Sequence, residues 1–319
     1  MPHPSRRMQK MSSEAALRAE VATRRQILGD KHPDTLGSIN NMAQLLQAQG
    51  KLAEAMPLQR EALAGQRETL GSKHSNTLGS INNMAMLLHA QGKLTEAEPL
   101  YREALAGHRE TLGNKHPNTL TSINNMGMLL TARGKLAEAE LLHREALAGL
   151  RETLGDKHPG TLVSIHNMAQ LLQVQGKLTK AEPLYQEAVA GLRETLGDKH
   201  HDTLTSINNM ALLFKNQGKL AEAEPLFREA YKGLRSLFGQ RHPDTVTSAH
   251  SLGTVLTAFG KHAEAAPLLA MSLEACALPS CGRGHAVGVK LKHCNGCNSV
   301  MYCCEARVPR SLARFYLSL

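Results

Sequence analysis

The sequence predicts an all-α solenoid built from antiparallel helix pairs. A stretch that begins Lys31-His32-Pro33-Asp34-Thr35-Leu36 returns every 42 residues, each time headed by a basic residue and a histidine: His32, His74, His116, His158, His200 and His242. Each unit also carries apolar residues at helical spacing and glycines where helices would end. A period of this length is typical of arrays in which neighbouring units complete each other's core, so we expect a curved chain of units with a concave face.

Two helices are predicted in each unit, here called the first and the second helix. In the first unit, the first helix carries apolar residues at i, i+3, i+4 and i+7, namely Ile39, Met42, Ala43 and Leu46. Gly50 is expected to end it and to form a tight turn. The apolar stripe of the second helix is Leu52, Ala55, Leu58, Ala62 and Leu63, and Gly71 stops it. Short connections make the two helices antiparallel neighbours.

The units divide the chain into five parts. Residues 30–275 form six full units. Before them, residues 13–29 align with the second half of a unit and are expected to be a capping helix, preceded by a basic, disordered leader at residues 1–12. After them come a cysteine-rich segment at residues 276–304 and a basic tail at residues 305–319.

The net charge of +9 belongs to the two ends of the chain. Residues 30–275 contain 25 basic and 25 acidic side chains, whereas residues 1–29 contain six and two, and residues 276–319 six and one. A nucleic-acid-binding stripe along the array is therefore not expected, since it needs clustered Lys and Arg. No apolar run reaches the ~18–20 residues of a membrane span, and no secretory signal is apparent at residues 1–29. We expect a soluble cytoplasmic or nuclear protein with no membrane partner.

The small residues of the units resemble the tetratricopeptide repeat: Ala43 in the first helix, Gly50 in the turn, and Ala55 and Ala62 in the second helix. The 42-residue length and the runs Asn40-Asn41-Met42-Ala43 and Gln91-Gly92-Lys93-Leu94-Thr95-Glu96-Ala97-Glu98-Pro99-Leu100-Tyr101 are similar to kinesin light chain repeats in particular. The resemblance implies a right-handed α-solenoid and a non-enzymatic scaffold whose groove holds a short peptide with acidic and aromatic residues. The kinesin heavy chain is not an expected partner, because residues 1–29 lack the sustained heptads of a coiled coil.

A polar stripe lies about a quarter to a half turn from the core face of each first helix, on the side that lines the concave groove in the resembling family. The candidate binding residues on this stripe are Asn40, Gln44, Asn82, Met86, His89, Asn124, Met128, His166, Gln170, Asn208, Leu212 and Lys215. Amides can both donate to and accept from an extended peptide backbone, and methionine adapts to varied apolar side chains.

A simpler interpretation of this stripe is that duplication copied a tolerated polar residue. Residues 72–113 and 114–155 are identical at 32 of 42 positions, so recurrence alone is weak evidence for selection at each site. In that case the adjacent series that begins with Asn41 would face solvent or the next unit.

The sequence contains no constellation typical of an enzyme. The recurring histidines are predicted to be loop residues, too far apart to share one ion, since zinc binds nitrogen at about 2 Å. The recurring Gly-Lys pair lacks the upstream glycine and the following Ser or Thr of a phosphate-binding loop. An enzymatic activity is therefore not predicted.

All six cysteines, Cys276, Cys281, Cys294, Cys297, Cys303 and Cys304, lie beyond residue 275 in spacings typical of zinc ligands. The stretch from Leu291 to Cys303 resembles the middle of a MYND-type zinc finger, a family that implies eight ligands and two zinc ions. The later ligands of that family are missing, so we expect a truncated finger with one zinc ion, or none.

Two ligand sets remain open for that ion: Cys276, Cys281, Cys294 and Cys297, or Cys276, Cys281, Cys303 and Cys304, with His285 or His293 as substitutes. An alternative function follows from the charge of this region. The chain would then be a nucleic-acid- or chromatin-associated factor that acts through its basic C-terminal segment.

Overall fold

The protein is described here from a computed structural model, which places residues 6–276. Within that range the regular structure is entirely helical, and the predicted fold class is confirmed. The thirteen helices are α1 (Arg6–Leu28), α2 (Pro33–Ala48), α3 (Leu52–Leu70), α4 (Ser75–Ala90), α5 (Leu94–Leu112), α6 (Pro117–Ala132), α7 (Leu136–Leu154), α8 (Pro159–Val174), α9 (Leu178–Leu196), α10 (His201–Asn216), α11 (Leu220–Phe238), α12 (Pro243–Ala258) and α13 (His262–Cys276).

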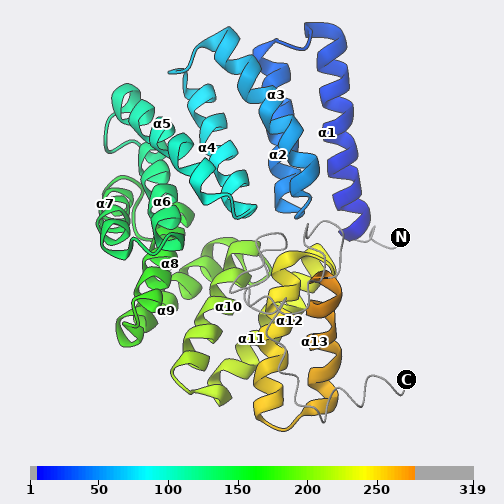
Figure 1. Ribbon diagram of the computed structural model, residues 1–319, viewed down its shortest axis with the longest axis vertical. Helices are drawn as coiled ribbons and strands as arrows, with labels where there is room; N and C mark the ends of the chain where they lie inside the picture. Colours follow the sequence, from blue (N-terminus) through cyan, green and yellow to red (C-terminus); the bar gives the residue numbers. More distant parts are fainter. Residues whose placement is uncertain (1–5, 277–319) are drawn as a thin grey trace.

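The even-numbered helices from α2 to α12 are the first helices of the six units, and the odd-numbered helices from α3 to α13 are the second helices. Each first helix packs on the second helix of its own unit and on that of the unit before. First helices of adjacent units also contact each other directly. The array therefore curves with the first helices on its inner side and the second helices on its outer side (Figure 1).

The recurring histidines cap the N-termini of the first helices. In each unit the histidine Nδ1 accepts a hydrogen bond from the backbone N–H two residues later, at 3.0–3.3 Å, as in His32 with Asp34 and His158 with Gly160. This bond satisfies a backbone donor that the helix leaves unpaired, and it requires the proton to sit on Nε2. The histidines thus have a structural role that their prediction as plain loop residues did not include.

The turn between the two helices of a unit has the same geometry six times. In the first unit, Gly50 adopts φ +75°, the Lys51 N–H bonds to the Leu46 carbonyl at 2.8 Å, and the Gly50 N–H bonds to the Gln47 carbonyl at 2.9 Å. This is a Schellman motif, which favours glycine because a side chain is strained at positive φ. The prediction that Gly50 ends the first helix is confirmed.

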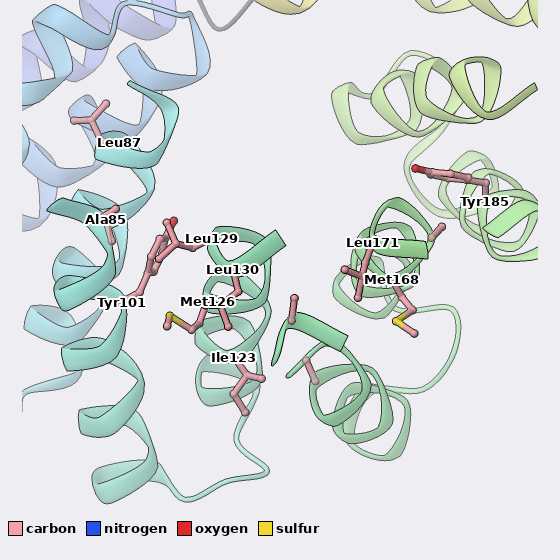
Figure 2. Packing of buried hydrophobic residues seen from close by; sticks show 14 of the residues in the cluster. Ala85, Leu87, Tyr101, Ile123, Met126, Leu129, Leu130, Met168, Leu171 and Tyr185 are labelled. Carbon is pink, nitrogen blue, oxygen red and sulfur yellow. The ribbon is translucent and has the colours of Figure 1, made fainter. Parts of the chain in front are cut away.

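The predicted core residues of the first helix, Ile39, Met42, Ala43 and Leu46, are all buried. Second helices add one large side chain per unit, such as Tyr101 of α5, which Figure 2 shows beside Leu129 and Leu130 of α6. The equivalent residues of the first five units are all buried: Gln59, Tyr101, His143, Tyr185 and Phe227. The sixth unit has the half-buried Leu269 at this position. Each unit therefore extends one continuous apolar core rather than closing a core of its own.

Two rows of ion pairs on the outer face join each second helix, or the loop that follows it, to the next second helix. One row joins an arginine to the glutamate 36 residues later: Arg25–Glu61, Arg67–Glu103, Arg109–Glu145, Arg151–Glu187 and Arg193–Glu229. The other joins a lysine to the glutamate 37 residues later: Lys31–Glu68, Lys73–Glu110, Lys115–Glu152 and Lys157–Glu194. Exposed pairs contribute only about 0.2–1 kcal/mol each to stability, so these rows add less to the stability of the array than its apolar core does.

The N-terminal cap is longer than predicted. Helix α1 begins at Arg6 and therefore extends into residues 6–12, which were expected to belong to a disordered leader. No proline or glycine interrupts the chain between Arg6 and Leu28, and the stretch is rich in residues that favour helices. Leu17 and Val21 of this helix lie against the core.

The first and the sixth unit touch each other across the curve. The Nε2–H of His242, at the start of α12, donates to the carbonyl oxygen of Ala48, at the end of α2, at 3.1 Å. The turn after α2 fits closely here, because a Cβ added to Gly50 would lie 2.8 Å from Cδ of Pro243. The ring of Phe238 stacks on His242 at 4.2 Å between centroids. The array thus closes on itself within one turn of its superhelix.

Candidate peptide-binding groove

The inner side of the curve is formed by the first helices, and the predicted polar stripe lies there. The stripe residues separate into a buried set and an accessible set. Asn82, Asn124 and His166 are buried, with exposed fractions of 7, 6 and 8 %. Gln44, Met86 and Gln170 are exposed, and the others are half-buried: Asn40, His89, Met128, Asn208, Leu212 and Lys215.

The buried set, together with the half-buried Asn40, is hydrogen-bonded to the next unit of the array. Asn40 Oδ1 accepts from Ser80 Oγ at 3.1 Å and from Asn83 Nδ2 at 3.2 Å, and Asn82 Oδ1 accepts from Asn125 Nδ2 at 3.2 Å. These bonds form because adjacent first helices lie close together on the inner side. We call the series Asn40, Asn82, Asn124 and His166, with its partners in the following units, the amide ladder.

The expectation of an exposed asparagine stripe is therefore corrected for Asn82, Asn124 and His166. Their side chains stabilise the junction between units, and burial leaves little of them for a ligand. The simpler interpretation expected the second asparagine of each pair to face solvent or the next unit. Asn41 is exposed, whereas Asn83 and Asn125 bond to the unit before.

Histidines take the place of amides at two points of the ladder. His143 Nδ1–H donates to Asn124 Oδ1 at 3.0 Å, as Gln59 Nε2–H donates to Asn40 Oδ1 at 2.9 Å. His166 bonds to Ser206 Oγ at 2.9 Å and to Asn209 Nδ2 at 3.1 Å. Burial lowers the pKa of both His143 and His166 to about 4, so both are neutral at physiological pH.

The accessible set offers amides and thioethers on one surface. Met86 is 38 % exposed, and it lies between the exposed amide of Gln44 in α2 and the half-buried Met128 in α6. Gln170 continues this surface on α8, and Leu212 continues it on α10. Such a surface can hydrogen-bond a peptide backbone and accommodate apolar side chains of different shapes.

One positive charge lies on the stripe. Lys215 Nζ donates to Thr254 Oγ1 at 2.7 Å, and partial burial lowers its pKa. Burial, together with the nearby Lys215, also lowers the pKa of His250 to about 4. A cation in partly desolvated surroundings interacts with a carboxylate more strongly than one in bulk water does. This end of the stripe therefore suits an acidic group.

The role of the serines in the ladder was not predicted. Ser80, Ser164 and Ser206 occupy the same position of α4, α8 and α10, and each bonds to the ladder residue 40 positions earlier. The sequence signal is the Ser-Ile-Asn-Asn run, which occurs in four of the six units and becomes Ser-Ile-His-Asn in the fourth unit and Ser-Ala-His-Ser in the sixth. Its meaning depends on the distance between adjacent helices, which one helix alone does not reveal.

The predicted zinc ligands lie outside the described residues, apart from Cys276, which ends α13. The zinc finger and its ligand sets therefore stay predictions. In residues 6–276, no group of three or more His, Cys, Asp or Glu side chains is arranged to hold a metal ion. None of the thirteen helices is long and apolar enough to cross a membrane.

The sequence patterns of the tetratricopeptide repeat match residues 35–76 and, in overlapping segments, residues 75–152, 124–192, 160–236 and 202–277. No curated protein is similar enough in sequence to match.

Several solved structures share the fold. A candidate kinesin light chain of Podosopora anserina with nearly identical TPR-like repeats is 29 % identical, with a TM-score of 0.50; the match covers 64 % of this chain and 96 % of that one. BtubC (BKLC) from P. vanneervenii is 19 % identical, with a TM-score of 0.53, over 76 % of this chain and 94 % of that one. NprR in complex with its cognate peptide NprX is 18 % identical, with a TM-score of 0.62, and the match covers 86 % of this chain and 76 % of that one. The family patterns span nearly the whole helical array, and the chain belongs to the tetratricopeptide repeat family.

Proposed function

We propose that this protein is a non-enzymatic interaction scaffold that holds an extended segment of a partner protein in its inner groove. The observation that carries the proposal is the accessible set of the inner stripe, above all Met86, which is exposed although it lies on the inner side of the curve. An exposed methionine between polar amides is typical of surfaces that bind varied peptides. The cognate peptide of NprR, a protein of the same fold, gives further support.

The ligand we propose combines apolar side chains with at least one carboxylate. Met86, Met128 and Leu212 would contact the apolar side chains, and Gln44 and Gln170 would bond the peptide backbone. The carboxylate would lie near Lys215, the charged residue of the stripe. In this arrangement the amide ladder beneath the groove keeps the first helices in register, so that the ligand meets a preformed surface.

Peptide-array binding to the full chain tests this function. The variant Gln44→Ala/Met86→Ala/Gln170→Ala is expected to weaken the selected peptides at least tenfold, because it removes two backbone contacts and one apolar contact. A matched control replaces the exposed outer residues Leu141, on α7, and Gln186, on α9, by alanine. Equal affinities for the two variants would show that the groove is not the binding site.

A further inference from the structure

A cavity of about 530 Å³ lies on the outer face of the last unit, between α11 and α13, with α12 at its floor. Leu252 and Leu256 form the floor, and Leu268 and Met271 form one wall. Tyr231, Lys232 and Arg235 of α11 form the opposite wall. We call this the outer cavity. It is separate from the inner groove, because second helices, not the polar stripe, form its walls.

The outer cavity lies where the arginine–glutamate row ends. Arg235 is the sixth arginine of that row, and its glutamate position is occupied by Met271. Three of the preceding arginines also pair with an aspartate five residues later, namely Asp30, Asp156 and Asp198, and here that position is Gln240. Arg235 has therefore lost both carboxylate positions that its equivalents use.

The outer cavity is also lined by a second cationic side chain, that of Lys232. Lys232 replaces the alanine found in the preceding units at positions 64, 106, 148 and 190. Lys232 and Arg235 lie three residues apart on α11 and so project from one face of the helix. Among the described residues, neither is paired with a carboxylate, and Arg235 contacts the Tyr231 hydroxyl at 3.4 Å instead. Arg228 and Glu264, which also line the cavity, form an ion pair with each other at 2.7 Å. The apolar floor thus lies beside two positive charges, Lys232 and Arg235, that no carboxylate among the described residues neutralises.

We propose that the outer cavity is a docking site for an acidic segment of a partner protein. An aliphatic or aromatic side chain of that segment would fill the space above Leu252 and Leu256, and a neighbouring carboxylate would bind Lys232 and Arg235. Charge complementarity selects this occupant. The chain's own residues 276–319, with six basic side chains and one acidic, have the wrong charge for the cavity.

The test uses the full chain with [methyl-¹³C]methionine and a fluorescein-labelled probe peptide, Gly-Ser-Leu-Phe-Asp-Glu-Ser-Gly. Met271 lies in the outer cavity, while Met86 and Met128 lie in the inner groove, so one spectrum reports on both sites. We expect saturable shifts of the Met271 methyl resonance, and at least tenfold weaker binding of the control peptide that carries Asn and Gln in place of Asp and Glu. A peptide that shifts only Met86 and Met128 would overturn this proposal and support the groove function.

Variants separate the charges from the shape of the cavity. Fluorescence anisotropy should show at least tenfold weaker binding for Arg235→Ala and for Lys232→Ala, and unchanged binding for Arg67→Ala, an arginine of the same row that keeps its glutamate. Met271→Glu restores the missing carboxylate and should abolish binding while the far-UV circular dichroism stays that of the native chain. Unchanged affinity in Arg235→Ala, or a Met271 shift that appears on raising the protein concentration without peptide, would overturn the proposal, the latter in favour of a second copy as the occupant.

Discussion

Asn125 Nδ2 donates a hydrogen bond to Asn82 Oδ1 at 3.2 Å, although the two residues are 43 positions apart in the chain. The same relation joins Asn83 to Asn40, and Asn209 to His166. Each bond crosses a junction between units on the concave side, where adjacent first helices lie close together. The amide ladder therefore determines the register of the array, and several predictions about stability depend on it.

Substitution of a ladder residue should cost stability. Asn124→Ala removes the acceptor of His143 and Ser164, leaving buried donors unsatisfied. We expect the free energy of unfolding to fall by about 1–3 kcal/mol, measured by urea denaturation followed by circular dichroism. Asn41→Ala is the matched control, since Asn41 is an exposed asparagine in the same turn of the first helix of the first unit. Equal stability of the two variants would contradict the ladder.

Acid should destabilise the array through its buried histidines. The pKa of His143 in the fold is about 4, lowered by burial, whereas an unfolded histidine titrates near 6.5. Between these values the unfolded chain binds a proton that the folded chain does not, so the free energy of unfolding falls as the pH drops from about 6.5 towards 4. One such histidine accounts for about 2 kcal/mol at pH 5.

His143→Gln isolates this effect. Gln59 makes the equivalent hydrogen bond in the first unit, so a glutamine can keep the contact with Asn124 while removing the titration. Chemical denaturation at pH 7 and pH 5 should show a smaller loss of stability in the variant than in the unaltered chain. An identical loss would mean that His143 does not carry the pH dependence.

His201 should act in the opposite direction. Burial lowers its pKa, but hydrogen bonds with Asp202 and Asp244 outweigh that effect and raise the pKa of His201 to about 9. Its contribution to stability is therefore complete below about 6.5 and is lost as the pH rises through about 9. His201→Gln should flatten the alkaline side of the stability profile between pH 7 and pH 9, measured by chemical denaturation. A profile unchanged on that side would contradict this assignment.

The second helices approach the first helices most closely at a recurrent glycine. A Cβ added at Gly107 would lie 2.3 Å from Cδ2 of the buried Leu78. We expect Gly107→Ala to lower the free energy of unfolding by about 1–3 kcal/mol through overpacking. Gly79→Ala, in α4, meets nothing within 4 Å and should instead raise stability by roughly 0.5–1 kcal/mol, because alanine favours helices. Thermal denaturation of both variants tests the sign of each change.

The contact between the first and sixth units can be tested with two equivalent glycines. Gly50 and Gly92 have nearly the same φ, +75° and +74°, so alanine is strained equally at both. Only at Gly50 would the added Cβ lie against Pro243. Small-angle X-ray scattering should show a larger radius of gyration for Gly50→Ala than for Gly92→Ala. Equal radii would show that the contact does not hold the two ends together.

The helix pairs, their boundaries and the core could be predicted because each depends on residues close in sequence. Periodicity identifies Ile39 and Leu46 as core, and Gly50 as the end of the first helix, without reference to any other unit. The capping role of the histidines was harder to predict, because histidine is not among the preferred N-cap residues.

The burial of Asn82 and Asn124 could not be predicted in the same way. A helical projection of one helix places both residues on an open face, and only the spacing between adjacent first helices closes that face. The contact of His242 with Ala48 is even harder to predict from the sequence. It depends on the superhelical curvature, which results from a small rotation between neighbouring units added over the whole array. By contrast, the departures from the repeat at Lys232 and Met271 are visible once the units are aligned. Their consequence, an arginine without its glutamate partner, could be recognised only after the structure showed the arginine–glutamate row.

The meeting of the α2–α3 turn with the start of α12 also constrains how this chain can evolve. Duplication lengthens such proteins by whole units, and an open solenoid tolerates any copy number. Here an extra unit inserted between the first and the sixth would carry His242 one step further round the superhelix and away from Ala48. Gain or loss of a single copy would thus change the shape of the whole molecule and not only its length.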